Sequence, residues 1–458
     1  MLKSFSILTL GCKVNQYESQ QIRALLTALG LRFVDVTDAP DLVVVNTCCV
    51  THTASAKSRR CIRKAQKHRP KAVVVCGCLP VVPTDEFKPD RENIHVVKDR
   101  SQLANTLNIL VAAESTTPGL PKPVQCPDVA IRPEISPKVK FKKDLAPPQE
   151  LPALTSFQGH TRAFLKIQDG CDSFCSYCII PYTRPEVRSK RPDKVLTEAA
   201  ALVASGHKEI VLTGVHVGAY GRSSVRQRRS DGLQDELLPD LLDKVACIPE
   251  LPRIRLSSLD PADVTERLLD VFAAHRNIMP HLHLSLQAGS DRVLGRMCRP
   301  YTADDFRAKV DLIHSRLDRP AITTDIIVGF PSETDADFQQ TVRLAREVQF
   351  AKMHVFTFSP RQGTAAAKMP DKVQSQIVKE RSQILRDIDL ELQSRFRERF
   401  LGETAQVLVE TTNARPAGRA ERYFMVYLNH AAPEPDNNDL VTVRIEQNTP
   451  NGVIASTL

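Results

Sequence analysis

The sequence predicts an α/β protein built from three folded parts, and two patterns in the chain carry this prediction. Short, almost wholly apolar runs alternate with amphipathic helical stretches over residues 1–113 and again, on a larger scale, over residues 157–398. Such alternation is typical of parallel strands joined by crossover helices. Short strand-like runs separated by turn residues then occupy residues 399–458. We therefore expect a small doubly wound α/β domain, a partial TIM-type (βα)6 barrel and a small antiparallel β-barrel, in that order.

The first part contains apolar runs with helical stretches between them. The runs are "SFSILTL", "DLVVVN", "KAVVV" and "NIHVV". The helical stretch "NQYESQQIRALLTALG" separates the first two runs, and a basic helical stretch separates the next two. Residues 114–156 are crowded with proline and lysine and show little periodicity, which indicates a linker or an extended wrap across the next domain.

Six strand-like runs follow in the central part. They are "AFLKIQDGC", "EIVLTGV", "RIRLSSL", "HLHLSLQ", "AITTDIIVGF" and "AKMHVFTF". Helical segments such as "VLTEAAALVASG" lie between them, and in barrels of this kind the loops after the strands carry the chemistry. A long amphipathic helix over residues 371–400 leads into the last part, whose runs are "TAQVLVE", "RYFMVYL" and "DLVTVRI".

Bulk composition argues against a membrane protein or a disulfide-rich secreted protein. The chain has 458 residues, 42% of them hydrophobic and 25% charged, and no apolar run long enough to cross a bilayer. The opening segment "MLKSFSILTLGC" is too short and interrupted for an export signal, so we expect a cytoplasmic protein. In that reducing compartment the twelve cysteines favour metal ligands, catalytic groups or buried thiols over disulfides. A net charge of +9 is compatible with a polyanionic partner.

Three cysteines lie together in "CDSFCSYC", directly after the first predicted barrel strand. Cys171, Cys175 and Cys178 can converge on one side of this loop without long-range folding. Four thiolates would saturate a four-iron cluster, whereas three leave one iron open for a substrate or cofactor. The alternative is a zinc site completed by a distant histidine such as His160 or His216, although the CxxxCxxC spacing is not typical of zinc.

A second trio, Cys12, Cys48 and Cys78, follows three predicted parallel strands of the first part. Ligands bind at the carboxyl edge of open α/β sheets, so these three thiols could meet there. The alternative is that they are buried or incidental cysteines, because free cysteine is often a small hydrophobe. Cys49 and Cys76 adjoin the trio and compete with Cys48 and Cys78 for the same role.

The strongest basic feature is the segment at residues 51–71, which contains eight lysine and arginine residues and no acidic residue. It follows Cys48 directly, so it could hold phosphates near the second trio; an ordinary solvated helix face is the alternative. A second basic patch at residues 222–230 reads as an insertion.

The segment "CDSFCSYC" after a barrel strand resembles the signature of radical S-adenosylmethionine enzymes. Together with "LGCKVNQYES", "NTCCVTHTASAKSRR", "CGC", "HLHLSLQAGSDRVLGRM", "TDIIVGFPSET" and "FSPRQGTAAAKMP", it makes nearly the whole chain similar to the methylthiotransferase family. Within that family the chain looks closest to the branch that acts on threonylcarbamoyladenosine in tRNA. Two sister branches, whose first motifs differ from "LGCKVN", act on isopentenyladenosine in tRNA and on an aspartate of a ribosomal protein.

The resemblance implies two [4Fe–4S] clusters, one on Cys171, Cys175 and Cys178 and an auxiliary one on Cys12, Cys48 and Cys78. It implies that S-adenosylmethionine chelates the open iron of the first cluster and yields a radical that removes hydrogen from C2 of the adenine. The product would be 2-methylthio-N6-threonylcarbamoyladenosine next to the anticodon. The implied partners are tRNA, an electron donor such as flavodoxin or ferredoxin, and a sulfur donor. No side chain is singled out as catalytic.

The resemblance also directs attention to the residues after the barrel strands as contacts for S-adenosylmethionine. These are Thr213, Gly214, Ser257, Ser258, Gln287 and Gly329. Glycines let a backbone approach a ligand, and short polar groups can bond its ribose and carboxylate. Taken singly, each fits a turn or barrel-filling role equally well, and His281 and His283 read as lumen histidines rather than ligands.

The last part resembles the TRAM domain, a small RNA-binding barrel, but its charge is acidic, with four basic and seven acidic residues over 401–458. RNA binding there would rest on aromatic residues such as Tyr423, Phe424 and Tyr427, which could equally form core. Other departures from the family pattern are Cys49, Pro185, the "SLQAG" motif and the long linker. A zinc-stabilised RNA-binding protein is the alternative outside the enzyme class.

Overall fold

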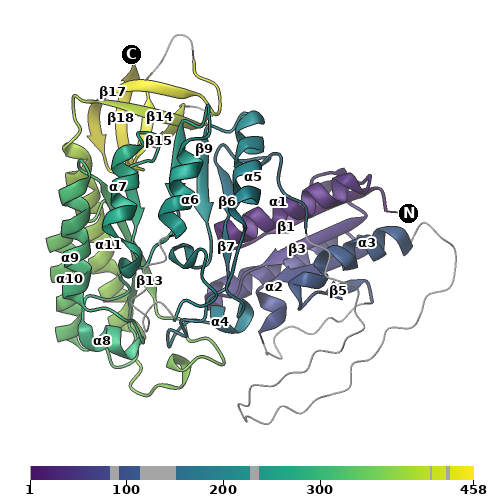
Figure 1. Cartoon of the computed structure of the whole chain (residues 1–458). Helices are drawn as coiled ribbons and strands as arrows, with labels where there is room; N and C mark the ends of the chain where they lie inside the picture. The colour runs from purple at the N-terminus through teal and green to yellow at the C-terminus, as the bar shows by residue number, and fades with distance from the viewer. Residues whose placement is uncertain (1, 83–91, 114–150, 227–236, 413–414, 430–433) are drawn as a thin grey trace.

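A computed structural model describes residues 2–82, 92–113, 151–226, 237–412, 415–429 and 434–458. Residues 114–150 of the expected linker, with Cys126, and residues 227–230 of the second basic patch lie outside the described residues. The three expected folded parts are all present, and Figure 1 shows them in chain order from purple to yellow. Within the described part of the chain, no helix has the length and hydropathy needed to span a bilayer.

The first part is a five-stranded parallel sheet with helices on both faces, as the sequence predicts. Its strands are β1 (Ser4–Thr9), β2 (Arg32–Phe33), β3 (Leu42–Thr47), β4 (Ala72–Gly77) and β5 (Ile94–Val96), in the order β2-β1-β3-β4-β5. Helices α1 (Lys13–Ala28) and α3 (Leu103–Ala113) contribute to one apolar core and α2 (His52–Lys67) to the other. Strands β3 and β4 are buried at every position, which explains their unbroken apolar runs. The short, exposed β2 was not predicted because two residues carry no periodic signal.

The central part has the six predicted parallel strands. They are β6 (Ala163–Lys166), β9 (Glu209–Thr213), β10 (Arg253–Leu256), β11 (His281–His283), β12 (Ala321–Val328) and β13 (Lys352–Thr357). They form two three-stranded sheets, and isolated bridges between residues in or next to β10 and residues next to β11 join the sheets into one curved wall. Among the described residues no ladder pairs β13 with β6, so the barrel is open on one side. Helix α1 contacts β6 and places Tyr17 in the barrel core.

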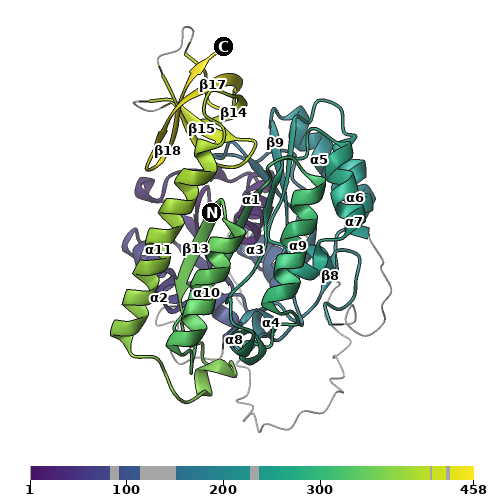
Figure 2. The same cartoon turned by 90° about the vertical axis from the view of Figure 1, so that its left-hand side faces the viewer.

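Helices cover the outer face of the curved wall (Figure 2). They are α5 (Pro192–Ala204), α6 (Leu237–Ala246), α7 (Glu266–Ala274), α9 (Ala303–Arg316), α10 (Asp335–Val348) and α11 (Ser375–Glu398). Shorter helices α4 (Ile180–Thr183) and α8 (Asp291–Arg296) lie near the carboxyl ends of the strands. Leu154, in the segment expected to be linker, is buried in the barrel core, so that segment joins the packed barrel before residue 157.

The last part is a closed five-stranded barrel. Its strands are β14 (Thr404–Thr411), β15 (Ala417–Ala420), β16 (Met425–Leu428), β17 (Leu440–Thr449) and β18 (Gly452–Thr457), in the order β14-β15-β16-β18-β17. Four of its pairings are antiparallel, as expected, but β16 and β18 pair in parallel. The reason is geometric: five strands in a closed ring cannot alternate direction all the way round.

The small barrel docks over the amino ends of the central strands through buried charges. Arg253 and Arg255 on β10 donate hydrogen bonds to backbone carbonyls of the small barrel at 2.7–3.0 Å. Glu209 on β9 is fully buried and accepts from Arg255 Nε at 3.0 Å. The Tyr423 ring stacks on His281 with centroids 4.3 Å apart, and the Phe424 ring contacts Phe396 of α11 with centroids 6.4 Å apart. Tyr423 and Phe424 therefore serve the contact between the two parts.

We expect the buried guanidinium of Arg253 to hold the small barrel in place. Replacing it in Arg253→Met leaves two backbone carbonyls without donors and Glu209 with less compensation, which should lower the free energy of unfolding by about 3 kcal/mol. The control is Arg267→Met, which removes an exposed ion pair with Asp240. This change should alter the free energy of unfolding by less than about 0.5 kcal/mol. Urea titration measures both, and equal midpoints for the two variants would contradict the role of Arg253.

Candidate active site

The cysteine loop lies at the carboxyl end of the central barrel, between β7 (Gln168–Asp169) and α4. Gly170 opens the loop with a φ of +77°, and a Cβ at this position would lie 1.8 Å from the Glu186 carbonyl oxygen, so only glycine fits. Hydrogen bonds between Ser176 and backbone groups of Met297 and Ala366 fix the middle of the loop to two neighbouring loops. The three cysteines are thus presented from a rigid support.

Two of the three cysteines in this trio have hydrogen-bond partners that hold their sulfurs in place. Burial opposes ionisation of Cys171, but hydrogen bonds with His216 and Ser173 bring its pKa below the ordinary value. Arg299 Nη1 donates to Cys175 Sγ at 3.4 Å and is itself held by Asp260 at 2.7 Å. Burial and repulsion by the neighbouring Cys175 raise the pKa of Cys178 to about 12. A bound cation would remove this last penalty, because metal ligation favours the thiolate.

The second trio lies at the carboxyl ends of three neighbouring strands in the first sheet. Cys12, Cys48 and Cys78 follow β1, β3 and β4, and each pair of these thiols is close enough for an electrostatic interaction. Asn15 on α1 donates to the carbonyls of Leu10 and Thr47 at 2.7 and 2.9 Å, which ties the first two strand ends together. The first turn of α1 therefore fixes the spacing of the trio.

Each of the other two cysteines has its own anchor. Ser58 on α2 exchanges hydrogen bonds with the backbone N–H and carbonyl of Cys48 at 3.1 and 2.8 Å. Gly77, with a φ of +91°, precedes Cys78, and a Cβ there would meet the Thr47 carbonyl oxygen at 2.4 Å. The Cys78 N–H donates to the same carbonyl at 3.0 Å, so the glycine lets the two strand ends approach closely.

Cys49 and Cys76, the two competing cysteines, differ in their positions. Cys49 is fully buried, and its thiol forms a hydrogen bond that lowers the pKa of Cys78, with Arg184 and Arg100 acting in the same direction. Arg100 Nη2 donates to Cys78 Sγ at 3.3 Å. Cys76 packs in the apolar core on the opposite face of the sheet, where burial raises its pKa to about 12. Cys76 therefore takes no part in the trio.

The spacing of the thiols distinguishes between a single ion and a cluster. Sulfur ligands about 2.3 Å from one tetrahedral zinc lie about 3.8 Å apart. Among the described residues, only His283, Asp325 and His354 offer three ligand atoms within 4.8 Å of one another. The three thiols of each cysteine trio are therefore too far apart to bind a single metal ion together. His216, the histidine considered as a fourth ligand, contacts Cys171 and also pairs with Asp263 at 3.2 Å. All-thiol donor sets suit both zinc and iron–sulfur clusters, and the wider spacing of these thiols favours a cluster over a single ion.

A buried ion network joins the two trios. Arg184, 2% exposed, donates to both carboxylate oxygens of Glu18 on α1 at 2.7 and 2.8 Å and to Asp169 on β7 at 2.7 Å. Lys166 contacts the same two carboxylates at 3.1 and 2.9 Å. Burial opposes ionisation of Glu18, yet these cations hold its pKa below its usual range. Since α1 begins beside Cys12 and β7 leads into the cysteine loop, this network fixes one trio relative to the other.

The residues expected to contact S-adenosylmethionine all follow barrel strands on the side of the cysteine loop. Thr213 and Gly214 end β9, Ser257 and Ser258 follow β10, Gln287 follows β11 and Gly329 follows β12. Ser257 and Ser258 line a cavity, and the buried Ser257 Oγ makes no hydrogen bond within the described residues.

The two glycines of that set have packing reasons for lacking a side chain. A Cβ at Gly329 would lie 2.4 Å from the side chain of Val378 on α11, and one at Gly214 would lie 2.9 Å from Gln168 Oε1. Gln287 has a φ of +68° and pairs through its backbone with β12. These three positions are thus accounted for by the fold itself.

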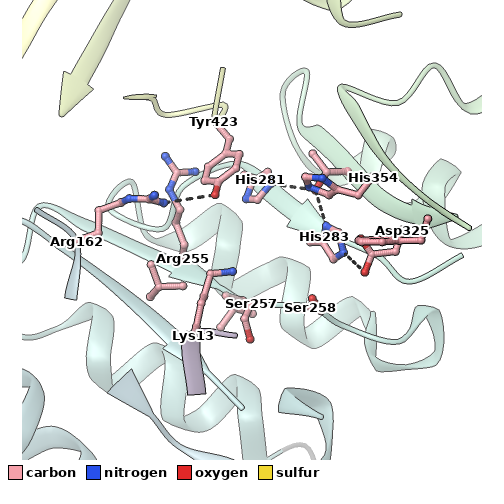
Figure 3. A pocket seen from close by; sticks show the side chains of 14 residues that line it. Lys13, Arg162, Arg255, Ser257, Ser258, His281, His283, Asp325, His354 and Tyr423 are labelled. Atoms are coloured by element: carbon pink, nitrogen blue, oxygen red, sulfur yellow. Dashed lines mark hydrogen bonds and ion pairs between the residues drawn. The ribbon is translucent and has the colours of Figure 1, made fainter. Parts of the chain in front are cut away.

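The cavity occupies the lumen of the central barrel and has a volume of about 270 Å³ (Figure 3). Its lining is mostly polar and comes from all three parts of the chain: Lys13, Arg162, Val211, Arg255, Leu256, Ser257, Ser258, His281, His283, Thr323, Asp325, His354, Phe356 and Tyr423. Thr323 Oγ1 lies 3.1 Å from His281 Nε2 and 3.0 Å from His283 Nδ1, which orients both imidazoles.

Sequence reasoning missed six polar residues of this cavity: Lys13, Arg162, Arg255, Thr323, Asp325 and His354. Lys13 directly follows Cys12, and that adjacency was the available signal. Asp325 and His354 pair in register on β12 and β13 and point into the same lumen. At the floor, Tyr423 is largely buried, but Arg162 and Arg419 lower its pKa to about 8. A strand pattern cannot predict which lumen residues meet.

Comparisons with known proteins agree with this geometry. The profile described as "Radical SAM superfamily" matches residues 165–345, and "Uncharacterized protein family UPF0004" matches residues 4–98. The chain is 36% identical to the threonylcarbamoyladenosine tRNA methylthiotransferase MtaB of Chlamydia pneumoniae, covering 98% of this chain and 97% of that protein. It is 31% identical to the tRNA-2-methylthio-N(6)-dimethylallyladenosine synthase of Bacillus velezensis, covering 97% and 84%.

Among solved structures, the fold is similar to the radical S-adenosylmethionine methyltransferase TsrM from Kitasatospora setae. The TM-score is 0.54 at 15% identity, covering 80% of this chain and 74% of the other. The fold and the matched regions define a radical S-adenosylmethionine enzyme. The chain belongs to the methylthiotransferase family of these enzymes, which leaves the zinc-stabilised binding protein without support.

We expect Arg184 to be needed for holding the two trios together. In Arg184→Met, Glu18 stays buried with only Lys166 to compensate it, so the free energy of unfolding should fall by about 3–5 kcal/mol. Arg188→Met is the control on the same segment, because its side chain is 71% exposed. Urea titration of both variants decides the point, and an Arg184→Met protein as stable as the control would exclude a structural role for the network.

Proposed function

We propose that the chain methylthiolates C2 of N6-threonylcarbamoyladenosine next to the anticodon of tRNA. The observation that carries the proposal is the pairing of two thiol trios across one buried ion network, beside a polar cavity. The near full-length similarity to proteins named for this tRNA nucleoside supports the choice of substrate. Relatives named for the dimethylallyl nucleoside are only slightly less similar, so that nucleoside is the second candidate.

In this proposal Cys171, Cys175 and Cys178 hold one [4Fe–4S] cluster with an open iron for S-adenosylmethionine. Cys12, Cys48 and Cys78 hold the auxiliary cluster. When bound, these groups supply the one-electron and sulfur chemistry that no side chain of the barrel can provide. Thr213, Gly214, Ser257, Ser258, Gln287 and Gly329 remain the proposed surroundings of S-adenosylmethionine.

The chain's own groups position the reacting centre. Arg299 and His216 hold Cys175 and Cys171 by hydrogen bonds, so these sulfurs stay oriented. Arg184 fixes the distance between the two trios. Tyr423 lines the far end of the lumen and stacks on His281, which orients that imidazole. The reaction also needs an electron donor, such as flavodoxin or ferredoxin, and a sulfur donor, and we place it in the cytoplasm.

Helix α2 is the proposed contact for the tRNA backbone. Thr51 caps its amino end, and Arg361 from the loop after β13 donates to Ser55 at 2.9 Å, so the helix is held beside the auxiliary trio. Its exposed cations are Lys57, Arg60, Arg63, Lys64 and Lys67. No acidic residue lies on the helix, so its exposed charge is available to phosphates.

The first test is mass spectrometry of tRNA nucleosides from cells that lack the gene and from cells in which it is restored. We expect 2-methylthio-N6-threonylcarbamoyladenosine to disappear, its unmodified parent to accumulate, and restoration to reverse both. Restoration with Cys12→Ala should fail to give product although the purified variant still cleaves S-adenosylmethionine, whereas Cys171→Ala should lose cleavage as well. Loss of a different methylthio nucleoside would show that the enzyme acts on that nucleoside and would contradict the proposed substrate.

The second test concerns tRNA binding by α2. Replacing Arg60, Arg63 and Lys67 by glutamine removes three exposed charges from one face of the helix and should weaken tRNA binding. The slope of log affinity against log salt should fall by about 2–3. The matched control replaces Lys372, Lys379 and Arg386, which are exposed on and before α11. An equal loss in the control would mean that only net charge matters and would overturn the role of α2.

A further inference from the structure

We propose that Lys13 is a specificity residue whose ammonium binds the carboxylate of the threonylcarbamoyl group inside the lumen cavity. This inference rests on the proposed function and names the part of the substrate that the cavity recognises. Lys13 is the first residue of α1, and its side chain lines the cavity together with residues of the barrel strands (Figure 3). It directly follows Cys12, so the cavity adjoins the auxiliary trio.

The charges that line the cavity single out Lys13. Arg162 pairs with Glu410 at 2.8 Å, and Arg255 pairs with Glu209 at 3.0 Å. Each of these two arginines therefore already has a carboxylate partner, although Glu209 is shared with Arg253 and Glu410 with Arg419. Within the described residues Lys13 forms no ion pair and no hydrogen bond through its side chain, although it is close enough to His281, His354 and Tyr423 to affect their ionisation. Its charge is free for a ligand.

Other groups in the cavity match the remaining polar atoms of such a substituent. The threonylcarbamoyl group carries a carboxylate, a hydroxyl and ureido N–H groups, so it needs a cation, acceptors and donors. Asp325, whose carboxylate lies 3.4 Å from His283 Nε2, offers acceptor oxygens. His281 Nδ1 is a buried atom without a hydrogen-bond partner in the described part of the chain. Unpaired buried polar atoms of this kind are costly unless a ligand satisfies them.

The same lining disfavours the dimethylallyl substituent of the sister substrate. That group is apolar and has no hydrogen-bonding atom, so filling the cavity with it would desolvate Lys13 and Asp325 without compensation. Sites built around hydrogen bonds reject analogues that lack them by large factors. At about 270 Å³ the cavity lies just below the usual range of ligand pockets, about 300–1,000 Å³, so it suits a substituent rather than a whole nucleotide.

The position of Lys13 also agrees with the site of reaction. In adenine, only N1 lies between C2 and the carbon that bears the N6 substituent. A substituent bound by Lys13 therefore keeps C2 close to the edge of the sheet that carries Cys12. Recognition and sulfur transfer would then use consecutive residues of the chain.

The experiment uses anticodon stem-loop RNA that carries either threonylcarbamoyladenosine or its methyl ester, in which the carboxylate charge is removed. With the reconstituted full-length wild-type enzyme, kcat/KM should be about 10- to 100-fold higher for the acid than for the ester, the factor expected of a charged hydrogen bond. In Lys13→Gln, kcat/KM for the acid RNA should fall to the value measured for the ester RNA. Lys13→Arg should keep most of the preference, and Lys244→Gln, an exposed lysine on α6, should keep all of it.

The ratio of acid to ester is measured within one preparation, so it does not depend on how completely the clusters of a variant are loaded. A ratio in Lys13→Gln equal to that of the wild type overturns the assignment of Lys13. A wild-type enzyme that converts both RNAs equally overturns it as well. A wild-type enzyme that converts dimethylallyladenosine RNA and neither of these two contradicts the proposed function itself, and the inference falls with it.

Discussion

The buried guanidinium of Arg184 is the contact on which the arrangement of the two cysteine trios depends. It binds both oxygens of Glu18 and also reaches Asp169, and all of these groups lie in the interface between the first sheet and the central barrel. Burying three charges is favourable only when each is paired in good geometry. An apolar contact could slide, whereas this directional network sets one relative position. The spacing of the two cysteine trios is thereby fixed by ion pairing.

Helix α1 is the element through which this constraint acts. One side of it packs Ile22 and Leu26 against the first sheet, and the other side presents polar groups to the barrel. Tyr17 on that side donates to Glu198 at 2.6 Å and accepts from Lys190 at 2.7 Å. The same helix begins beside Cys12, so a single segment contributes to the second cysteine trio, to the contact between the two parts and to the lining of the lumen cavity.

The acidic character of the small barrel follows from its position. Glu410 pairs with Arg162 at 2.8 Å and Glu403 pairs with Arg319 at 2.7 Å, so its carboxylates meet arginines of the central part. Part of the negative charge that argued against RNA binding by the small barrel is therefore used in ion pairs with the central part. Tyr423 reaches the lumen from the same side, which explains why an aromatic residue of the tail lines a cavity of the barrel.

The sequence by itself determined the three folded parts, the six predicted strands of the barrel and the cysteines that end strands or fill one loop, because these depend on local periodicity and short spacings. The sequence patterns did not predict strands β2, β15 and β18, because these strands are short or lie in turn-rich sequence.

Only the tertiary structure decided which residues meet across the fold. Lys13, Asp325 and Tyr423 come from three different parts of the chain and line one cavity. Arg184 and Glu18, 166 positions apart, form one pair. The physical reason is that strand patterns state which face a side chain takes, whereas the partner on that face depends on how the sheets close and dock.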